Sequence, residues 1–342
     1  MDLELNLRTY SLIGMLALLG LAIGLPFLLN EYWLYLFVLI IIYIITAMAL
    51  NVCLGYLGLL NLGYTAMFGV AGYITALLTI DVGLSEWIGL IAALGGVGLV
   101  SLAIGSVALR LKGVYFILVM VAFLGICGGT ALSASGITGG SSGLGRLPIP
   151  SIMGLEFSTT FRYYYLALVV LLICLYVVYR LVNSRVGRAM IAVRDNEDLA
   201  NSQGINPFRY KMIGFVTTGL LAATGGWLYA HFLRFIDPGI FGFSLLFDTA
   251  FAVLVGGAGT LGGPIVGSLF VVIVPQLLGK IPVENIESIR YVIFTVLLVV
   301  AIVRMPQGIW GWLKARYNYR YKMARFITLR NPYCLLDEDL IP

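Results

Sequence analysis

The chain has 342 residues, of which 61% are hydrophobic and only 11% charged, with a mean hydropathy of +1.00. Soluble domains carry about 25% charged residues, so this composition excludes a protein whose main solvent is water. The formal net charge is +5. Because basic residues of membrane proteins concentrate on cytoplasmic loops, we expect membrane lipids around the chain and no nucleic acid as a partner.

The first part of the sequence contains five apolar blocks. They occupy residues 9–29, 33–54, 57–79, 87–109 and 114–132, separated by short polar or charged breaks. About 20 helical residues cross a hydrocarbon core of about 30 Å, so each block is a candidate span. The first lacks a small-residue cleavage site and is followed by further apolar blocks, which indicates a retained span. Residues 1–132 are therefore predicted to form a first transmembrane half.

A polar stretch, 133–162, follows; its Gly-rich run at 138–143 and its prolines predict a connecting loop outside the cytoplasm. The second half, 163–311, offers five further blocks at 163–182, 212–233, 241–255, 261–278 and 291–303. The third and fifth of these are short. Irregular backbone is tolerated at membrane depth where protein or water surrounds it, so we expect broken or re-entrant segments here. Residues 312–342 are predicted to form a cytoplasmic tail.

The basic residues determine the predicted orientation. If the charged loop 183–211 is cytoplasmic and ten spans alternate around it, sixteen of the 21 basic residues face the cytoplasm, as the positive-inside rule requires. These are Arg8, Arg110, Lys112, Arg180, Arg185, Arg188, Arg194, Arg209, Lys211, Arg304, Lys314, Arg316, Arg320, Lys322, Arg325 and Arg330. The other five are Arg146, Arg162, Arg234, Lys280 and Arg290. Both termini are thus expected in the cytoplasm of a multi-pass protein of the cytoplasmic (inner) membrane.

With this orientation the first five spans start inside and the second five start outside. That arrangement is an inverted-topology repeat, which builds a central pathway in transporters. The predicted fold class is all-α: a polytopic transmembrane helical bundle of about ten spans in two inverted five-helix halves, with broken or re-entrant segments.

Polar residues inside the predicted spans are candidates for a translocation pathway, because polar groups in hydrocarbon are costly. Asn61, Tyr64 and Thr65 either line such a pathway or make hydrogen bonds between helices. Asp248 is the sole acid deep in a predicted span. It lines the pathway, contacts a neighbouring chain, or reaches water near a span end.

The sequence offers no constellation for catalysis or metal binding. It has one histidine, His231, and four cysteines whose spacing fits no metal site and for which we assign no disulfide. The nucleotide-binding motif is absent, since Gly279-Lys280 is followed by Ile281. An intramembrane enzyme would need a nucleophile with a base, or metal ligands, inside the spans. We therefore expect no catalytic residue, no metal and no cofactor.

The loop 183–211 is polar, yet residues 197–203 read as a short helix that ends at Gly204 before the turn at Asn206-Pro207. A polar helix between two spans indicates a partner that packs on it; the alternative is an ordinary connecting loop. Segments of this loop resemble the coupling loop of branched-chain amino-acid ABC permeases, in particular the M-type subunit of the leucine, isoleucine and valine importer family. The segments are Ser184-Arg185-Val186-Gly187-Arg188-Ala189, Ala192-Val193-Arg194-Asp195-Asn196-Glu197, Gly204-Ile205-Asn206 and Arg209-Tyr210-Lys211.

Further motifs between residues 50 and 311 resemble landmarks of the same family. They are Leu50-Asn51, Gly55-Tyr56, Leu60-Asn61-Leu62-Gly63-Tyr64, Phe68-Gly69, Tyr115-Phe116, Ala122-Phe123, Thr138-Gly139-Gly140, Gly143-Leu144, Tyr229-Ala230-His231, the Gly-rich run from Gly256 to Pro264, and Pro306-Gln307-Gly308. The sequence departs from the family at Ala200-Asn201-Ser202, where a Glu among alanines is usual, and at Tyr64, where many members have His.

The resemblance implies a permease subunit of an ATP-driven importer of branched-chain or other small amino acids. ATP would be bound by separate ABC ATPase subunits, and the implied partners include a second related permease, as a heterodimer, and an extracytoplasmic solute-binding protein. The residues implied in ATPase coupling are Arg188, Arg194, Asp195, Glu197, Asp198, Asn201, Gly204 and Asn206. Urea permeases share this framework, so urea or a related small solute is an alternative substrate.

A secondary transporter is the alternative from another class, since inverted repeats and scarce intramembrane charge suit it as well. The loop 183–211 distinguishes the two, because a secondary transporter has no need of a coupling loop.

Overall fold

The computed structural model describes residues 20–152, 154–279, 295–296, 298–300, 304 and 308–312. Most of the predicted spans 9–29 and 291–303, and the tail after residue 312, lie outside these residues. The chain divides into two compact units, residues 1–250 and 251–342, which are described separately. Helix α11 (Phe243–Gly256) begins in the first unit and ends in the second.

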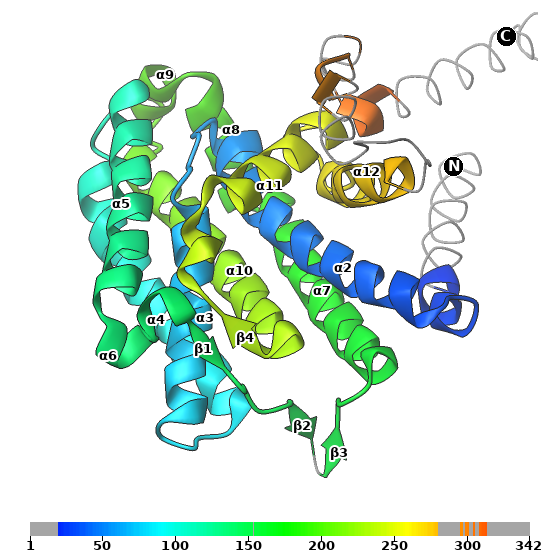
Figure 1. The fold of residues 1–342 in the computed structure, drawn as a ribbon. Helices are drawn as coiled ribbons and strands as arrows, with labels where there is room; N and C mark the ends of the chain where they lie inside the picture. Colours follow the sequence, from blue (N-terminus) through cyan, green and yellow to red (C-terminus); the bar gives the residue numbers. More distant parts are fainter. Residues whose placement is uncertain are drawn as a thin grey trace, which may run out of the picture. The chain divides into compact units, whose positions relative to one another are not determined.

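The described residues are almost entirely helical (Figure 1). The remaining α-helices are α2 (Glu31–Asn51), α3 (Tyr64–Ile80), α4 (Glu86–Ala108), α5 (Val114–Ser133), α6 (Ser135–Thr138), α7 (Thr160–Val182), α8 (Arg185–Asp195), α9 (Glu197–Ser202), α10 (Pro207–Leu233) and α12 (Gly263–Leu278). Short 3₁₀ or π segments are η1 (Leu25–Phe27), η2 (Val52–Tyr56), η3 (Gly140–Ser142) and η4 (Pro238–Phe241). Four two-residue strands, β1 (Leu144–Gly145), β2 (Ser151–Ile152), β3 (Leu155–Glu156) and β4 (Phe235–Ile236), form the antiparallel pairs β1–β4 and β2–β3.

Five of the described helices are long and apolar enough to cross a membrane: Glu31–Tyr56, which joins α2 to η2, and α4, α5, α7 and α10. Three more, α3, α11 and α12, are apolar but shorter. Each predicted span that falls within the described residues is therefore a helix, which confirms the polytopic helical fold. The count of ten spans and the inversion of the two halves stay predictions.

The predicted span 57–79 needs a correction at its start, because α3 begins only at Tyr64. Gly58 has a φ of +69°, in the left-handed region that favours glycine. Farther along, Asn61 Oδ1 accepts a hydrogen bond from the Gly63 N–H at 3.0 Å. Residues 57–63 thus form a connection that separates α2 and η2 from a 17-residue helix. The interruption matches the expectation of broken segments, but it lies in a block that sequence analysis treated as continuous.

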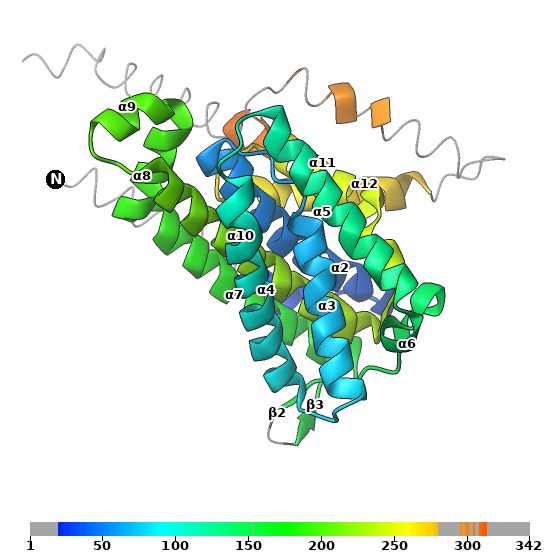
Figure 2. The same cartoon turned by 90° about the vertical axis from the view of Figure 1, so that its left-hand side faces the viewer.

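Helix α10 lies at the centre of the first unit, in contact with α2, α3 and α4 (Figures 1 and 2). Glycines permit this close packing. A Cβ atom at Gly226 would lie 2.0 Å from the Phe68 carbonyl oxygen of α3, and one at Gly219 would lie 2.2 Å from Ser101 Oγ of α4. In the most apolar 18-residue stretch of each long helix, the buried share is 83% for Glu31–Tyr56 and 61% for α10, but only 28% for α4 and 22% for α5. Helices α2, α3 and α10 therefore form the core, and α4 and α5 leave apolar faces for lipid or another chain.

In the second unit, the last turns of α11 and the first turns of α12 also approach through glycine. A Cβ atom at Gly267 would lie 1.7 Å from the Ala252 carbonyl oxygen, and one at Gly256 would lie 1.9 Å from that of Gly263. Small residues at these spacings allow backbone to meet backbone in membrane helices. The Gly-rich run therefore permits dense packing between α11 and α12.

The contact between Gly226 and Phe68 predicts a stability effect. Gly226→Ala should force α10 away from the α3 backbone and lower the unfolding free energy by about 1–3 kcal/mol, the usual cost of overpacking. Thermal unfolding of the detergent-purified protein measures this. The matched control is Gly95→Ala on α4, where a Cβ atom meets nothing within 4 Å. If the two variants unfold at the same temperature, the packing described for α10 is wrong.

Candidate functional site

The loop 183–211 folds into two helices, α8 and α9, instead of the single helix predicted at 197–203. Helix α8 starts at Ser184, whose Oγ accepts hydrogen bonds from the N–H groups of Val186 and Gly187 at 3.1 and 3.3 Å. Helix α8 was not predicted, because the polar residues before Gly204 indicated a helix only at 197–203. The signal was present in the buried Ala189, Met190 and Val193, whose spacing places one apolar face along a helix.

Side-chain caps lie on both sides of helix α9: one starts α9 itself, and the other starts α10. Asn196 Oδ1 accepts a hydrogen bond from the Leu199 N–H at 2.9 Å and so starts the helix. Gly204 follows its end with a φ of +80°, and the Ile205 N–H bonds the Ala200 carbonyl oxygen at 3.0 Å. Asn206 Oδ1 then accepts from the Arg209 N–H at 3.2 Å and caps α10. A sharp turn is thereby fixed on both sides of α9.

Four of the five charged side chains predicted for ATPase coupling, Arg188, Arg194, Asp195 and Glu197, form hydrogen bonds within this chain. Glu197 Oε2 forms an ion pair with Lys211 Nζ of α10 at 2.7 Å, and the Lys211 side chain is only 7% exposed. Arg194 Nη1 donates to the Gly55 carbonyl oxygen at 2.7 Å, while its Nε and Nη2 donate to Asp195 Oδ1. Glu197 and Arg194 therefore tie the loop to the transmembrane helices. Arg188, Asp198 and Asn201 are exposed and available to a partner.

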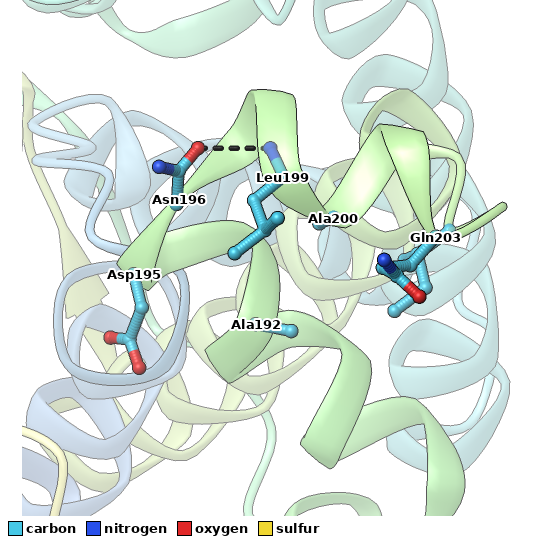
Figure 3. A pocket seen from close by; sticks show the side chains of 7 residues that line it. Ala192, Asp195, Asn196, Leu199, Ala200 and Gln203 are labelled. Atoms are coloured by element: carbon cyan, nitrogen blue, oxygen red, sulfur yellow. Dashed lines mark hydrogen bonds between the residues drawn. The ribbon is translucent and has the colours of Figure 1, made fainter.

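A hollow of about 230 Å³ lies between α8 and α9 (Figure 3). Its lining is mostly apolar and consists of Ala192, Asp195, Asn196, Leu199, Ala200, Gln203 and Ile205. The Leu199 side chain extends from α9 toward α8 (Figure 3) and is 60% exposed. A small apolar surface is thus exposed within a polar loop.

A second group of polar side chains lies among the apolar helices of the first unit. Tyr64, at the start of α3, is fully buried; its hydroxyl donates to the Leu246 carbonyl oxygen of α11 at 3.0 Å and hydrogen-bonds to Thr249 Oγ1. On the same helix, Asp248 Oδ2 accepts a hydrogen bond from Tyr43 of α2 at 3.5 Å. The structure thus brings together Tyr64 and Asp248, which sequence analysis proposed separately.

Asn61 and Thr65 make local contacts instead. Asn61 is buried and turns the chain before α3 through Gly63, and in the described part of the chain its Nδ2 atom has no hydrogen-bond partner. Thr65 Oγ1 donates to the Leu62 carbonyl oxygen at 3.4 Å. Tyr43 and Thr249 were not predicted as site residues; for Tyr43, the signal in the sequence was a tyrosine inside a long apolar block.

His231 has a structural environment. Its Nδ1 atom lies 3.0 Å from the Pro148 carbonyl oxygen and must donate there, so Nε2 accepts from Thr75 Oγ1 at 3.1 Å. The side chain therefore joins α10, α3 and the loop 133–162. Among the described residues, no group of three or more His, Cys, Asp or Glu side chains could hold a metal ion.

Comparisons with known proteins place this arrangement in a family. The family described as branched-chain amino acid transport system / permease component matches residues 32–302. The high-affinity branched-chain amino acid transport system permease protein LivM of Escherichia coli K12 is 30% identical over 326 residues, which cover 86% of this chain and 74% of LivM. The corresponding LivH protein is 33% identical over 128 residues, covering 37% of this chain and 40% of LivH. Among solved structures, PsaBC from Streptococcus pneumoniae in complex with Fab aligns with 80% of this chain and 91% of that chain, at 16% identity and a TM-score of 0.43.

The ion pair between Glu197 and Lys211 predicts non-additive effects on stability. Glu197→Ala and Lys211→Met should each lower the unfolding temperature, the first more than the second, because the first leaves the buried Lys211 and the second the half-buried Glu197 without a partner. The double variant should lose less than the sum of the two, by a coupling energy of about 0.5–3 kcal/mol. Thermal unfolding of all four proteins in detergent gives this cycle.

The control cycle combines Asp81→Ala with Lys112→Met, two exposed residues on different loops, and should be additive. Additivity for Glu197 and Lys211 as well would show that the pair contributes nothing to the fold.

Proposed function

The chain belongs to the branched-chain amino acid transport permease family, and we propose that it is the permease subunit of an ATP-driven importer for branched-chain or other small amino acids. It is a multi-pass protein of the inner membrane and a transport permease, not an enzyme. The observation that carries the proposal is the loop 183–211, with two capped helices, a tether to α10 and an apolar hollow between exposed polar residues.

In this proposal α9 docks on a separate ABC ATPase subunit. Arg188, Asp198 and Asn201 provide exposed polar contacts, and Leu199 provides an exposed apolar one. Gly204 and Asn206 hold the turn that presents the helix. ATP binds to the partner, and closure of the ATPase moves the loop and the spans α7 and α10 on either side of it.

The translocation pathway is proposed to pass the polar group formed by the buried Tyr64 and the half-buried Asp248. The hydroxyl of Tyr64 joins α3 to α11 over a sequence separation of 182 residues. Such a contact closes the space between two short apolar helices, and it can open when they separate. Because the surrounding side chains are largely apolar, we expect weak and transient contact with the substrate.

The other partners follow from the relatives. LivM and LivH are both named as permease proteins of one branched-chain amino acid transport system, and we propose that this chain likewise pairs with a second, related permease. The apolar faces of α4 and α5 leave room for such a neighbour or for lipid. An extracytoplasmic solute-binding protein would deliver the substrate, and both termini would lie in the cytoplasm.

Docking through α9 predicts that uptake and ATP hydrolysis fall together. In proteoliposomes containing the ATPase, both permeases and the binding protein, Asp198→Lys and Leu199→Asp should each reduce both rates about tenfold, which corresponds to about 1.4 kcal/mol of lost docking. Asp198 is the better site for charge reversal, since Glu197→Lys would also place a cation beside Lys211. ATPase co-purification should fall in parallel.

The control is Asp81→Lys, an exposed acid after α3, which should leave both rates unchanged. Wild-type uptake by both α9 variants, with the ATPase still bound, would mean that the loop is only a connector.

In this proposal the solute-binding protein selects the substrate, so the permease itself should bind the substrate only weakly. Equilibrium titration of the purified permease pair with leucine, valine and urea should give dissociation constants well above about 1 μM, or less than about 8.2 kcal/mol of binding free energy. Stoichiometric ATP binding to the isolated chain should also be absent. Micromolar or tighter affinity for any of the three solutes would favour a secondary transporter.

A further inference from the structure

Helix α2 ends in an unusual way. Its last turn, Val52–Tyr56 (η2), is π-helical, and Gly58 then reverses the chain with a φ of +69°. The Leu59 N–H bonds back to the Cys53 carbonyl oxygen at 2.9 Å. Single π turns within α-helices occur frequently at functional sites. A helix end also leaves carbonyl groups without helical partners, so the Gly55 carbonyl needs a donor from elsewhere.

Arg194 of α8 is that donor. Its Nη1 atom reaches the Gly55 carbonyl oxygen at 2.7 Å over a sequence separation of 139 residues. Its aliphatic chain lies against Gly58, where a Cβ atom would be 2.8 Å from Arg194 Cγ. Asp195 accepts from Nε and Nη2 at 3.0 and 2.9 Å and so orients the guanidinium group. Arg194 therefore both hydrogen-bonds to the end of η2 and packs against the residue that reverses the chain after it.

The preceding part of η2 is anchored to α10. Thr218 Oγ1 donates to the Ala49 carbonyl oxygen at 2.9 Å and lies 3.2 Å from Cys53 Sγ. Beyond Gly58, the connection continues through the buried Asn61 to Tyr64. Movement of Arg194 relative to α10 would therefore bend the chain between a fixed point at Cys53 and the start of α3.

We propose that Arg194 is the positioning residue that transfers movement of the loop 183–211 to η2 and the connection 57–63, and thereby to Tyr64. This inference rests on the proposed coupling role of the loop. The two roles involve different contacts. Arg194 acts on other parts of this chain, whereas Asp198 and Leu199 are proposed to contact the ATPase. Arginine suits the task because its planar fork serves Asp195 and Gly55 at once, and lysine has no equivalent geometry.

If Arg194 is such a link, replacing it should uncouple substrate uptake from ATP hydrolysis. In the reconstituted importer, Arg194→Gln and Arg194→Lys should leave ATPase co-purification and hydrolysis close to the wild-type level. The number of substrate molecules taken up per ATP hydrolysed should fall about tenfold, a size within the range of coupling between distant sites. Arg185→Gln, an exposed arginine on the same helix, is the matched control and should keep the wild-type ratio.

Other outcomes separate the hypotheses. If co-purification, hydrolysis and uptake fall together in the Arg194 variants, Arg194 is a docking contact; the link is then refuted while the proposed function stands. A wild-type uptake ratio in both variants refutes the link as well. If Arg194→Gln does not accumulate in the membrane, Arg194→Lys decides by the same ratio. Uptake by the wild-type complex without ATP would overturn the proposed function itself.

Discussion

The structure depends on one constraint: backbone N–H and C=O groups in an apolar environment must find partners within the protein. Long helices meet this requirement on their own, and α2, α4, α5, α7 and α10 do so over their apolar lengths. Where a helix is interrupted, a side chain must take over. At the end of α2 and in η2, Thr218 donates to the Ala49 carbonyl and Arg194 to that of Gly55. The interruptions are thus where sequence-distant elements are joined.

This substitution of side chains for backbone partners explains why the candidate sites lie at helix ends. A complete helix presents only side chains to its neighbours, whereas a broken one also presents carbonyl groups that bind a specific donor. The connection 57–63 separates α2 and η2 from α3 and places Tyr64 at a helix start, where it meets α11. Each such bond can be exchanged for another at modest cost. Interrupted helices can therefore move between discrete arrangements while the intact helices stay packed.

Hydropathy predicted most of the fold, because a run of about 20 apolar residues has few alternatives to a helix in lipid. The described ends of α4, α5 and α7 differ from the predicted ones by three residues or fewer. The late start of α3 was not predicted, since Gly58 and Asn61 stand in a sequence that is apolar overall. At the candidate sites, the sequence indicated Tyr64, Asp248 and Gly204 as separate candidates. It could not identify the pairs Glu197–Lys211 and Arg194–Gly55, because these depend on tertiary contacts that leave no periodic pattern.

The two ties of the loop 183–211 have different mechanical consequences. The ion pair of Glu197 with Lys211 joins α9 to the central helix α10, and because the Lys211 side chain is only 7% exposed, removing Glu197 would leave a buried charge without its partner at considerable cost. The bond from Arg194 to Gly55 is made by a side chain that is 37% exposed, and it ends on a neutral carbonyl. Water can compete for that bond more readily. Force applied to the loop would therefore act on α10 through the ion pair and on the end of α2 through Arg194, and the second contact is the one that can more readily be remade after the loop has moved.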